Sequence, residues 1–358
     1  MMMKAFKYRI YPNQEQQEYF AKTFGSTRFI YNRMLSDKIE HYKLTKQSLK
    51  NTPAQYKAEF PWLREVDSLA LANAQMNLEK AYKNFFRDKN VGFPQFKSKK
   101  NNHRSYTTNN QKGTVSIEAG YIKLPKLKTP VKIRQHRIID GLIRSCTISQ
   151  TPSGNYFVSL LVACEIVKMP QLETKVGIDV GIKTFAVLSN GVVIENPKHL
   201  RKSEKRLAKL QKDLSRKVKG SKNRDKARLK VARLHEKISN QRLDFLHKKS
   251  FETVRDNQVI VLEDLKVKNL VKNHKLAKAI SEVSWRMFRE MIEYKAQWYG
   301  RAVVIAPTHY ASSQLCSDCG NKSSQTKDLS CRTYVRPGCG LEIDRDYNAS
   351  LNLLKLAV

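Results

Sequence analysis

The chain has 358 residues, in which 67 Lys and Arg stand against 32 Asp and Glu, giving a formal net charge of +35 and a pI of about 10.0. A protein this basic repels itself unless a polyanion neutralises it, so nucleic acid is the expected partner, ahead of an acidic membrane surface. The sequence holds no apolar run of about 18 residues and no signal-peptide core. A membrane protein or a secreted protein is therefore not expected, and the predicted location is the cytoplasm, in association with the nucleoid.

The N-terminal half begins with a strand and continues with helices. Residues 4–10 alternate in polarity, and apolar residues then recur at helical spacing from about Gln14 to Phe86. A basic linker follows, with the sequence KSKKNNHR at 97–104. Short alternating segments, separated by turn residues, fill 106–167. This order predicts a small antiparallel β-barrel whose first strand is 4–10, with the helical region inserted after that strand.

The C-terminal half is predicted to form a second domain that begins near Leu172. Its expected strands are three in succession within 176–196, then 259–265 and 302–307, and a helix is expected from about Ser284 to Tyr299. Between them, residues 201–249 hold 19 Lys and Arg against five Asp and Glu. Apolar residues keep helical spacing on both sides of Gly220-Ser221, which predicts a helical hairpin, apolar inside and cationic outside. A merely solvated helix face is the simpler alternative, but so few acids cannot supply the usual salt-bridge pairing.

Three carboxylates stand at the ends of these predicted elements. Asp179 lies near the end of the strand GIDVG, Glu263 ends the strand VIVLE, and Asp346 stands at the start of a predicted helix in DRDYNAS. Acids beside an apolar sheet are costly unless a cation compensates them, and Mg²⁺ prefers oxygen ligands. Two such ions about 4 Å apart activate a water and stabilise the leaving oxygen of a phosphodiester. Each acid alone is more simply a turn residue or a helix cap, but the ordered set favours a nuclease.

The segments GIDVGIK, VLEDL and DRDYNAS, with a cysteine cluster before the third, resemble the three split RuvC motifs of the TnpB family of transposon-encoded nucleases, which is related to the type V CRISPR effectors. The resemblance extends over nearly the whole chain, through KAFKYRIYPNQEQ, FGSTRFIYN, GFPQFKSKK and TISQTPSGNYFVSLLV. It implies an α+β multidomain fold. The implied parts are a β-barrel wedge domain (1–12 and 104–170), a helical recognition insertion with the basic linker (13–103), an RNase H-like (RuvC) α/β nuclease domain (171–315 and 341–358) and a zinc-finger-like insert (316–340).

The resemblance also implies a function, that of an RNA-guided, Mg²⁺-dependent DNA endonuclease associated with a transposon, which cuts target DNA next to a short motif that the protein reads. Its implied partners are guide RNA and target DNA, in a monomeric ribonucleoprotein with no membrane partner. The implied catalytic and Mg²⁺-binding residues are Asp179, Glu263 and Asp346. Asp346 is preferred over Asp344 because the family's catalytic Asp stands two residues before the Asn, here Asn348, and Asp344 is then a cap or a residue that supports the metal ligands without binding the metal. The alternatives are a guide-dependent DNA-binding repressor without cleavage and a structural RNA-binding protein, and the intact acid triad argues against both.

The cysteines divide into a C-terminal cluster and two core candidates. CSDCG places Cys316 and Cys319 in the Cys-x-x-Cys knuckle of a structural zinc site. The family's second knuckle would have cysteines at 336 and 339, but this chain has Arg336, so Cys331 is the candidate replacement beside Cys339. The open alternatives are a three-cysteine site closed by water and a degenerate finger without metal. Two further cysteines lie in alternating strands and are predicted to be core residues: Cys146 and Cys164.

Candidate nucleic-acid contacts are spread over the whole chain. The basic candidates lie in the linker, the barrel and the helical hairpin: Lys97, Lys99, Lys100, Arg134, Arg137, Arg201, Lys202 and Lys205. The polar candidates for contact with base edges are Thr107, Thr108 and Asn109. By the resemblance, a helix that bears Lys83 and Asn84 faces the DNA motif. A polar turn into the barrel explains residues 106–109 equally well.

Overall fold

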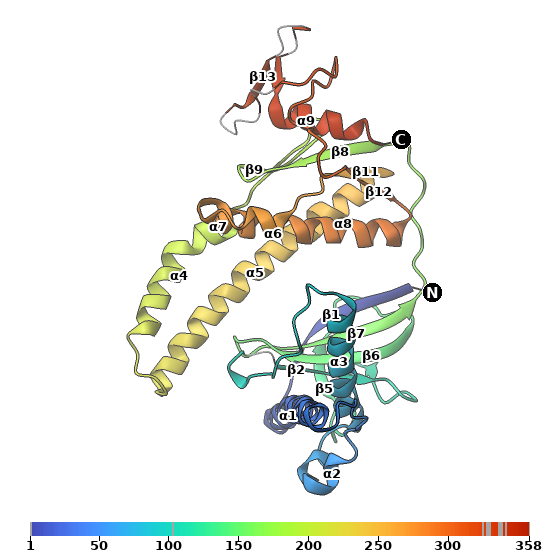
Figure 1. The fold of residues 1–358 in the computed structure, drawn as a ribbon, viewed down its shortest axis with the longest axis vertical. Coiled ribbons are helices and arrows are strands. Elements are labelled where there is room, and N and C mark those ends of the chain that lie inside the picture. The colour runs from blue at the N-terminus through green and yellow to red at the C-terminus, as the bar shows by residue number, and fades with distance from the viewer. Residues whose placement is uncertain are drawn as a thin grey trace. The chain divides into compact units, whose positions relative to one another are not determined.

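The computed structural model describes residues 2–101, 104–323, 326, 331–335, 339–340 and 342–357. The chain divides into two compact units, Met1–Glu165 and Ile166–Val358, coloured blue to green and green to red in Figure 1. No helix in the described part of the chain is long and apolar enough to cross a membrane.

The first unit is built on a seven-stranded antiparallel sheet with the strand order β2-β6-β7-β1-β5-β4-β3. Its strands are β1 (Met2–Tyr11), β2 (Arg104–Asn109), β3 (Ser116–Glu118), β4 (Tyr121–Lys123), β5 (Val131–Arg134), β6 (Leu142–Gln150) and β7 (Tyr156–Cys164). The predicted first strand is confirmed, since β1 lies inside the sheet between β7 and β5. The described strands form an open sheet with β2 and β3 at its edges. Cys146 and Cys164 are buried, as predicted.

The helices of this unit follow β1 along the chain, as the sequence predicts. They are α1 (Gln14–Thr45), α2 (Tyr56–Glu59) and α3 (Ser68–Arg87), with 3₁₀ segments at Pro61–Arg64 and Lys99–Asn101. A capping box starts α1, because Asn13 Oδ1 accepts from Gln16 N at 2.9 Å and Gln16 Oε1 accepts from Asn13 N at 3.0 Å. Fully buried apolar side chains such as Met34, Leu71 and Leu78 then join α1 to α3 in one core.

The second unit is built on a five-stranded mixed sheet with the order β10-β9-β8-β11-β12. Its strands are β8 (Lys175–Val180), β9 (Thr184–Leu188), β10 (Val193–Glu195), β11 (Val259–Leu262) and β12 (Ala302–Ile305). β8, β11 and β12 run parallel, whereas β9 and β10 continue from β8 as antiparallel hairpins. All five strands predicted for the C-terminal half are therefore confirmed.

Helices cover both faces of this sheet (Figure 1). They are α4 (His199–Ser215), α5 (Lys222–Asp256), α6 (Val267–Leu270), α7 (His274–Val283), α8 (Trp285–Tyr299) and α9 (Arg345–Leu354), and a two-stranded ribbon is formed by β13 (Thr333–Val335) and β14 (Glu342–Asp344). The alternation along β11 shows the two faces: Ile260 and Leu262 enter the core with α5 and α8, whereas Val261 packs with Leu353 of α9.

The predicted helical hairpin is confirmed as α4 and α5. Ser221 caps α5, since its Oγ accepts a hydrogen bond from Arg224 N at 3.1 Å. Leu207, Leu234 and Ile238 are buried between the two helices, and most of the basic side chains of the hairpin are exposed. This places the apolar residues inside and the cations outside.

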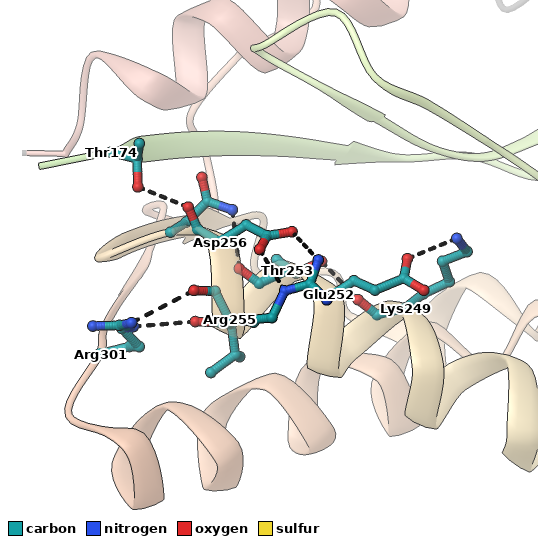
Figure 2. A network of polar contacts seen from close by, with 9 residues as sticks. Thr174, Lys249, Glu252, Thr253, Arg255, Asp256 and Arg301 are labelled. Atoms are coloured by element: carbon teal, nitrogen blue, oxygen red, sulfur yellow. Dashed lines mark hydrogen bonds and ion pairs between the residues drawn. The ribbon is translucent and has the colours of Figure 1, made fainter. Parts of the chain in front are cut away.

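A buried arginine and a threonine hold the C-terminal end of α5, as Figure 2 shows. Arg301 follows α8 and donates to Val254 O at 3.1 Å and, from Nη1, to Pro170 O at 2.7 Å. Thr174 Oγ1 donates to Asp256 O at 2.7 Å. The last carbonyl groups of an α-helix have no partner within the helix, so these two side chains satisfy them and fix α5 against the start of β8.

Gly177, in β8, is the point of closest approach between the sheet and α9. A Cβ at this position would lie 2.2 Å from Ser350 O and 2.5 Å from Leu354 N, both backbone atoms of α9. The strand is held there by a hydrogen bond from Gly177 N to Ser189 Oγ at 3.0 Å. Neither backbone can move easily, so only a glycine permits this packing.

We expect Gly177→Ala to lower the free energy of unfolding by about 3 kcal/mol or more, because a methyl group here overlaps helix backbone. Urea denaturation measures the change. The matched control is Gly25→Ala within α1, where an added Cβ has nothing within 4 Å and α-helix propensity predicts a gain of about 0.5–1 kcal/mol. Equal stabilities of Gly177→Ala and the unmodified protein would contradict this account of the packing.

Candidate active site and cysteine cluster

The three predicted carboxylates line one cavity of about 530 Å³ in the second unit. β8 and β11 are parallel neighbours in which Ile178 lies opposite Leu262. Asp179 and Glu263 each follow these paired residues, so they emerge side by side at the same edge of the sheet. Asp346 lies in the first turn of α9, which packs on β8 beside them.

Burial and mutual repulsion make this cluster of acids costly to ionise. Burial raises the pKa of Asp179 well above its usual range, and the carboxylates of Glu263 and Asp346 raise this pKa further. Burial also raises the pKa of Glu263, against the opposing effect of the hydrogen bond that Ser312 Oγ donates to Glu263 Oε1. The nearby Arg345 lowers both pKa values but does not cancel the rise. Carboxylate oxygens that are gathered in one cavity and resist ionisation there favour a bound cation, which would compensate their charge.

Basic side chains share the cavity with the acids. They are Lys183, Lys198, Arg201, Arg332 and Arg345. Arg332 Nη1 lies 3.3 Å from Asp346 Oδ2 and forms an ion pair with it. Of these cations, only Arg201 was predicted from the sequence, as a nucleic-acid contact. Arg345 was recognisable as the middle residue of DRD, whereas nothing local marks Arg332 as a partner of Asp346.

The two aspartates of DRDYNAS have different places, as the sequence predicts. Asp344 is the N-cap of α9, and its Oδ1 accepts from Asp346 N and Tyr347 N, each at 2.9 Å. Asp346 lines the cavity and Asp344 does not belong to its lining. Capping therefore accounts for Asp344 without any role in the cavity.

A further acid, Asp264, follows Glu263, but its carboxylate is used in structural hydrogen bonds. Lys266, Arg289 and Thr308 donate hydrogen bonds to its carboxylate, the last two at 2.8 and 2.9 Å. These bonds hold the pKa of Asp264 well below its usual range, in the opposite direction to that of Glu263. Asp264 thus ties α8 to the end of β11.

Two asparagines of α9 attach the loop that leads to the first cysteine pair. Asn348 is fully buried, and its Nδ2 donates to Leu315 O at 2.7 Å while its Oδ1 accepts from Ser317 N at 2.9 Å. Asn352, one turn later, donates to Leu315 O at 2.7 Å and to Ser312 O at 2.9 Å. The sequence-based prediction included Asn348 but not Asn352. Their spacing of four places both side chains on one face of the helix, which could have indicated a shared role.

Three of the four predicted zinc ligands come together. The sulfur atoms of Cys316, Cys319 and Cys339 all lie within 4.8 Å of one another, and no other group of three such ligand atoms is this compact among the described residues. Cys316 is buried, and Gly320 N donates to Cys316 O at 3.0 Å in the turn of the knuckle. The donor set suits a thiophilic metal. The carboxylate oxygens of Asp179, Glu263 and Asp346 do not all lie within 4.8 Å of one another, so the three acids are spread more widely over their cavity than the three cysteines over theirs.

Cys331 is not brought into this group. Its Sγ donates to Thr333 O at 3.2 Å, just before β13. Thr333 is paired with Asp344 across the ribbon, which fixes the backbone next to Cys331. Arg336, which replaces the family cysteine, lies outside the described residues.

The candidate nucleic-acid residues fall into exposed and enclosed sets. The basic candidates are all exposed: Lys83, Lys97, Lys99, Lys100, Arg134, Arg137, Arg201, Lys202 and Lys205. Asn84, Thr107 and Asn109 are partly exposed, and Thr107 Oγ1 lies 2.8 Å from Thr147 Oγ1. Thr108 is fully buried and donates a hydrogen bond to Asp67, so this residue is corrected from a base contact to a core residue.

Comparison with known proteins identifies similar segments and a similar fold. Models of three families match, described as "Probable transposase" at residues 159–274, "Cas12f1-like, TNB domain" at 285–353 and "Helix-turn-helix domain" at 1–47. Among solved structures, the Cas12f1 chain of a "Cas12f1-sgRNA-target DNA complex" has a TM-score of 0.62 at 16% identity, over 95% of this chain and 83% of that one. At this identity the likeness shows a common mixed α/β fold.

Two relatives are similar over almost their whole length. A "Putative RNA-guided DNA endonuclease" of Streptomyces pristinaespiralis is 41% identical over 98% of this chain and 88% of its own. The "Putative RNA-guided DNA endonuclease InsQ" of Escherichia coli K12 is 32% identical over 98% of this chain and 92% of its own. The chain therefore belongs to the TnpB family, together with these relatives described as RNA-guided DNA endonucleases.

Proposed function

We propose that this protein is an RNA-guided, Mg²⁺-dependent DNA endonuclease associated with a transposon, which cuts target DNA next to a short motif that the protein reads. The observation that carries the proposal is the cavity lined by Asp179, Glu263 and Asp346 in a chain of this family. In this proposal the second unit holds the RNase H-like (RuvC) nuclease domain, and residues 316–340 form its zinc-binding insert. The first unit supplies the wedge domain, whose described strands form an open half-barrel and not the closed barrel expected from the sequence, and its helical recognition insertion.

Asp179, Glu263 and Asp346 are the proposed ligands of Mg²⁺. All three are oxygen donors. Burial, and then repulsion from the neighbouring carboxylates, raises the pKa values of Asp179 and Glu263, and a hard cation relieves both effects. When bound, Mg²⁺ activates the attacking water and stabilises the leaving oxygen of the phosphodiester. Ser312 holds Glu263 in place, and Arg332 holds Asp346.

The cations of the cavity are proposed to hold the substrate backbone. Lys198 and Arg201 stand at the start of α4 and line the same cavity as the acids. Their charges attract phosphates that the carboxylates alone would repel. The exposed basic residues of the hairpin extend this positive surface away from the cavity, which suits a long nucleic acid.

Guide RNA and target DNA are the proposed partners, in a monomeric ribonucleoprotein. The net charge of +35 supports a polyanionic partner that covers much of the protein. Base pairing with the guide then reads most of the target, while the protein holds the heteroduplex through its backbone. The proposed location is the cytoplasm, in association with the nucleoid.

Zinc is the proposed metal of the cysteine cluster. Cys316, Cys319 and Cys339 supply three thiolates, and the geometry supports no role for Cys331. Structural zinc is almost always four-coordinate, so a donor other than Cys331 completes the shell, with water as the simplest one. Such a site binds zinc more weakly than a four-cysteine site.

The first prediction concerns the carboxylates. Asp179→Ala, Glu263→Ala and Asp346→Ala should each slow Mg²⁺-dependent DNA cleavage about a thousand-fold or more, because each removes a metal ligand worth several kcal/mol. Binding of guide and target, measured by gel shift, should survive. Asp344→Ala is the matched control and should keep measurable cutting after the loss of a helix cap. An inactive Asp344→Ala beside an active Asp346→Ala would reverse this assignment.

The second prediction concerns the guide. Purified protein should carry a small RNA whose removal abolishes cutting, and replacing the guide segment should redirect cleavage to a matching site. Sequencing of the copurified RNA and cleavage assays on two unrelated targets test both points. RNA-independent cutting of duplex DNA would refute the proposal, and guided binding with no cutting at any target would favour the repressor.

The third prediction concerns zinc. Metal analysis should find one zinc per protein, lost in Cys316→Ser and Cys339→Ser but retained in the matched variant Cys331→Ser. Arg336→Cys should tighten binding against a competing chelator, because it supplies a thiolate at the Cys-x-x-Cys spacing. Loss of zinc in Cys331→Ser would show that this thiol is a ligand after all.

A further inference from the structure

A second cavity, of about 620 Å³, adjoins the acid-lined one. Both cavities are lined by Val180, Glu263 and Trp285, so they meet at the end of β11 and the start of α8. A group bound in the second cavity is therefore separated by a single layer of side chains from any group bound among the carboxylates.

The interior of this second cavity is apolar and partly aromatic. Trp285 and Phe288 come from α8, and Leu265 and Val267 come from the segment after β11. The lining acids Glu290 and Glu293 are held by arginines of the same helix, each at 2.8 Å. Paired charges at the edge and apolar walls inside are typical of a site for a flat organic group, and they do not suit a free anion.

Trp285 carries one unsatisfied polar atom. Its side chain is 8% exposed, and the indole Nε1 has no hydrogen-bond partner among the described residues. Because Nε1 is enclosed, Trp285 offers a ligand in the cavity its aromatic ring and not a hydrogen bond. A nucleobase has a flat ring that stacks on such a side chain.

We propose that this cavity receives the nucleobase next to the phosphodiester that is cut. The inference rests on the proposed function, since the scissile phosphate must lie among Asp179, Glu263 and Asp346. The cavity volume suits a single nucleotide. The exposed Lys268 at its wall, for which no ion pair occurs among the described residues, suits a neighbouring phosphate. The base stacks on the aromatic wall and thereby fixes the position of the attached phosphate over the acids.

The test combines a filled cavity with a missing base. Val267 lines the cavity and is partly exposed at the edge of the core, so Val267→Phe should fill part of the cavity, and urea denaturation should show that the variant is folded. It should slow cleavage of an intact target about tenfold, and an abasic residue at one position beside the cut should slow the unmodified protein by a similar factor. The two changes together should cost no more than either alone. Val193→Phe, on the exposed strand β10, is the matched control and should leave cleavage unchanged.

A binding measurement keeps this test independent of cleavage. In a Trp62→Phe, Trp298→Phe double variant, Trp285 is the remaining tryptophan, and a single-stranded oligodeoxynucleotide in metal-free buffer should quench its emission. An oligonucleotide abasic throughout, which keeps its phosphates, should quench several-fold less, and Val267→Phe should remove the difference. Equal quenching by both oligonucleotides, or a multiplicative loss of cleavage, would overturn the proposal. If cleavage fails altogether while the quenching difference remains, the proposed function fails and the base site stands.

Discussion

Helix α9 packs on strand β8 at a distance that only a glycine permits, and the candidate site depends on this contact. Gly177 lies two residues before Asp179, and α9 begins with the turn that holds Asp346. The third acid follows β11, the parallel neighbour of β8. The close contact of α9 with β8 and the pairing of β8 with β11 thus bring together carboxylates from three distant parts of the chain.

The second constraint is electrostatic. A chain with a net charge of +35 gathers three acids at one cavity, where burial and repulsion raise the pKa values of Asp179 and Glu263. Basic side chains surround them without cancelling the effect. At the next position the pKa of Asp264 is shifted in the opposite direction, because hydrogen bonds from three donors stabilise its ionised carboxylate. Glu263, by contrast, accepts a hydrogen bond from Ser312 alone among the described residues, which does not offset its burial.

The loop that leads to the cysteine cluster depends on the same helix as the candidate active site. Asn348 and Asn352 of α9 bind the backbone that leads into the first cysteine pair, and Asp344 both ends β14 and caps α9. The close packing at Gly177 leaves α9 no free space toward the sheet, so the helix that carries Asp346 also gives this loop a fixed support.

The sequence by itself determined the strands of the second unit, the helical hairpin, the buried cysteines of the first sheet and the capping role of Asp344, because hydrophobic period, turn residues and caps are local signals. It also selected the three acids that line one cavity. Only the tertiary structure decided that Arg332 pairs with Asp346, that the buried Thr108 donates a hydrogen bond to Asp67, and that Cys331 stays apart from the other thiols. These outcomes depend on which residues meet across the fold. Sequence spacing limits how far a side chain can reach, whereas the packing of neighbouring elements fixes the direction in which it points.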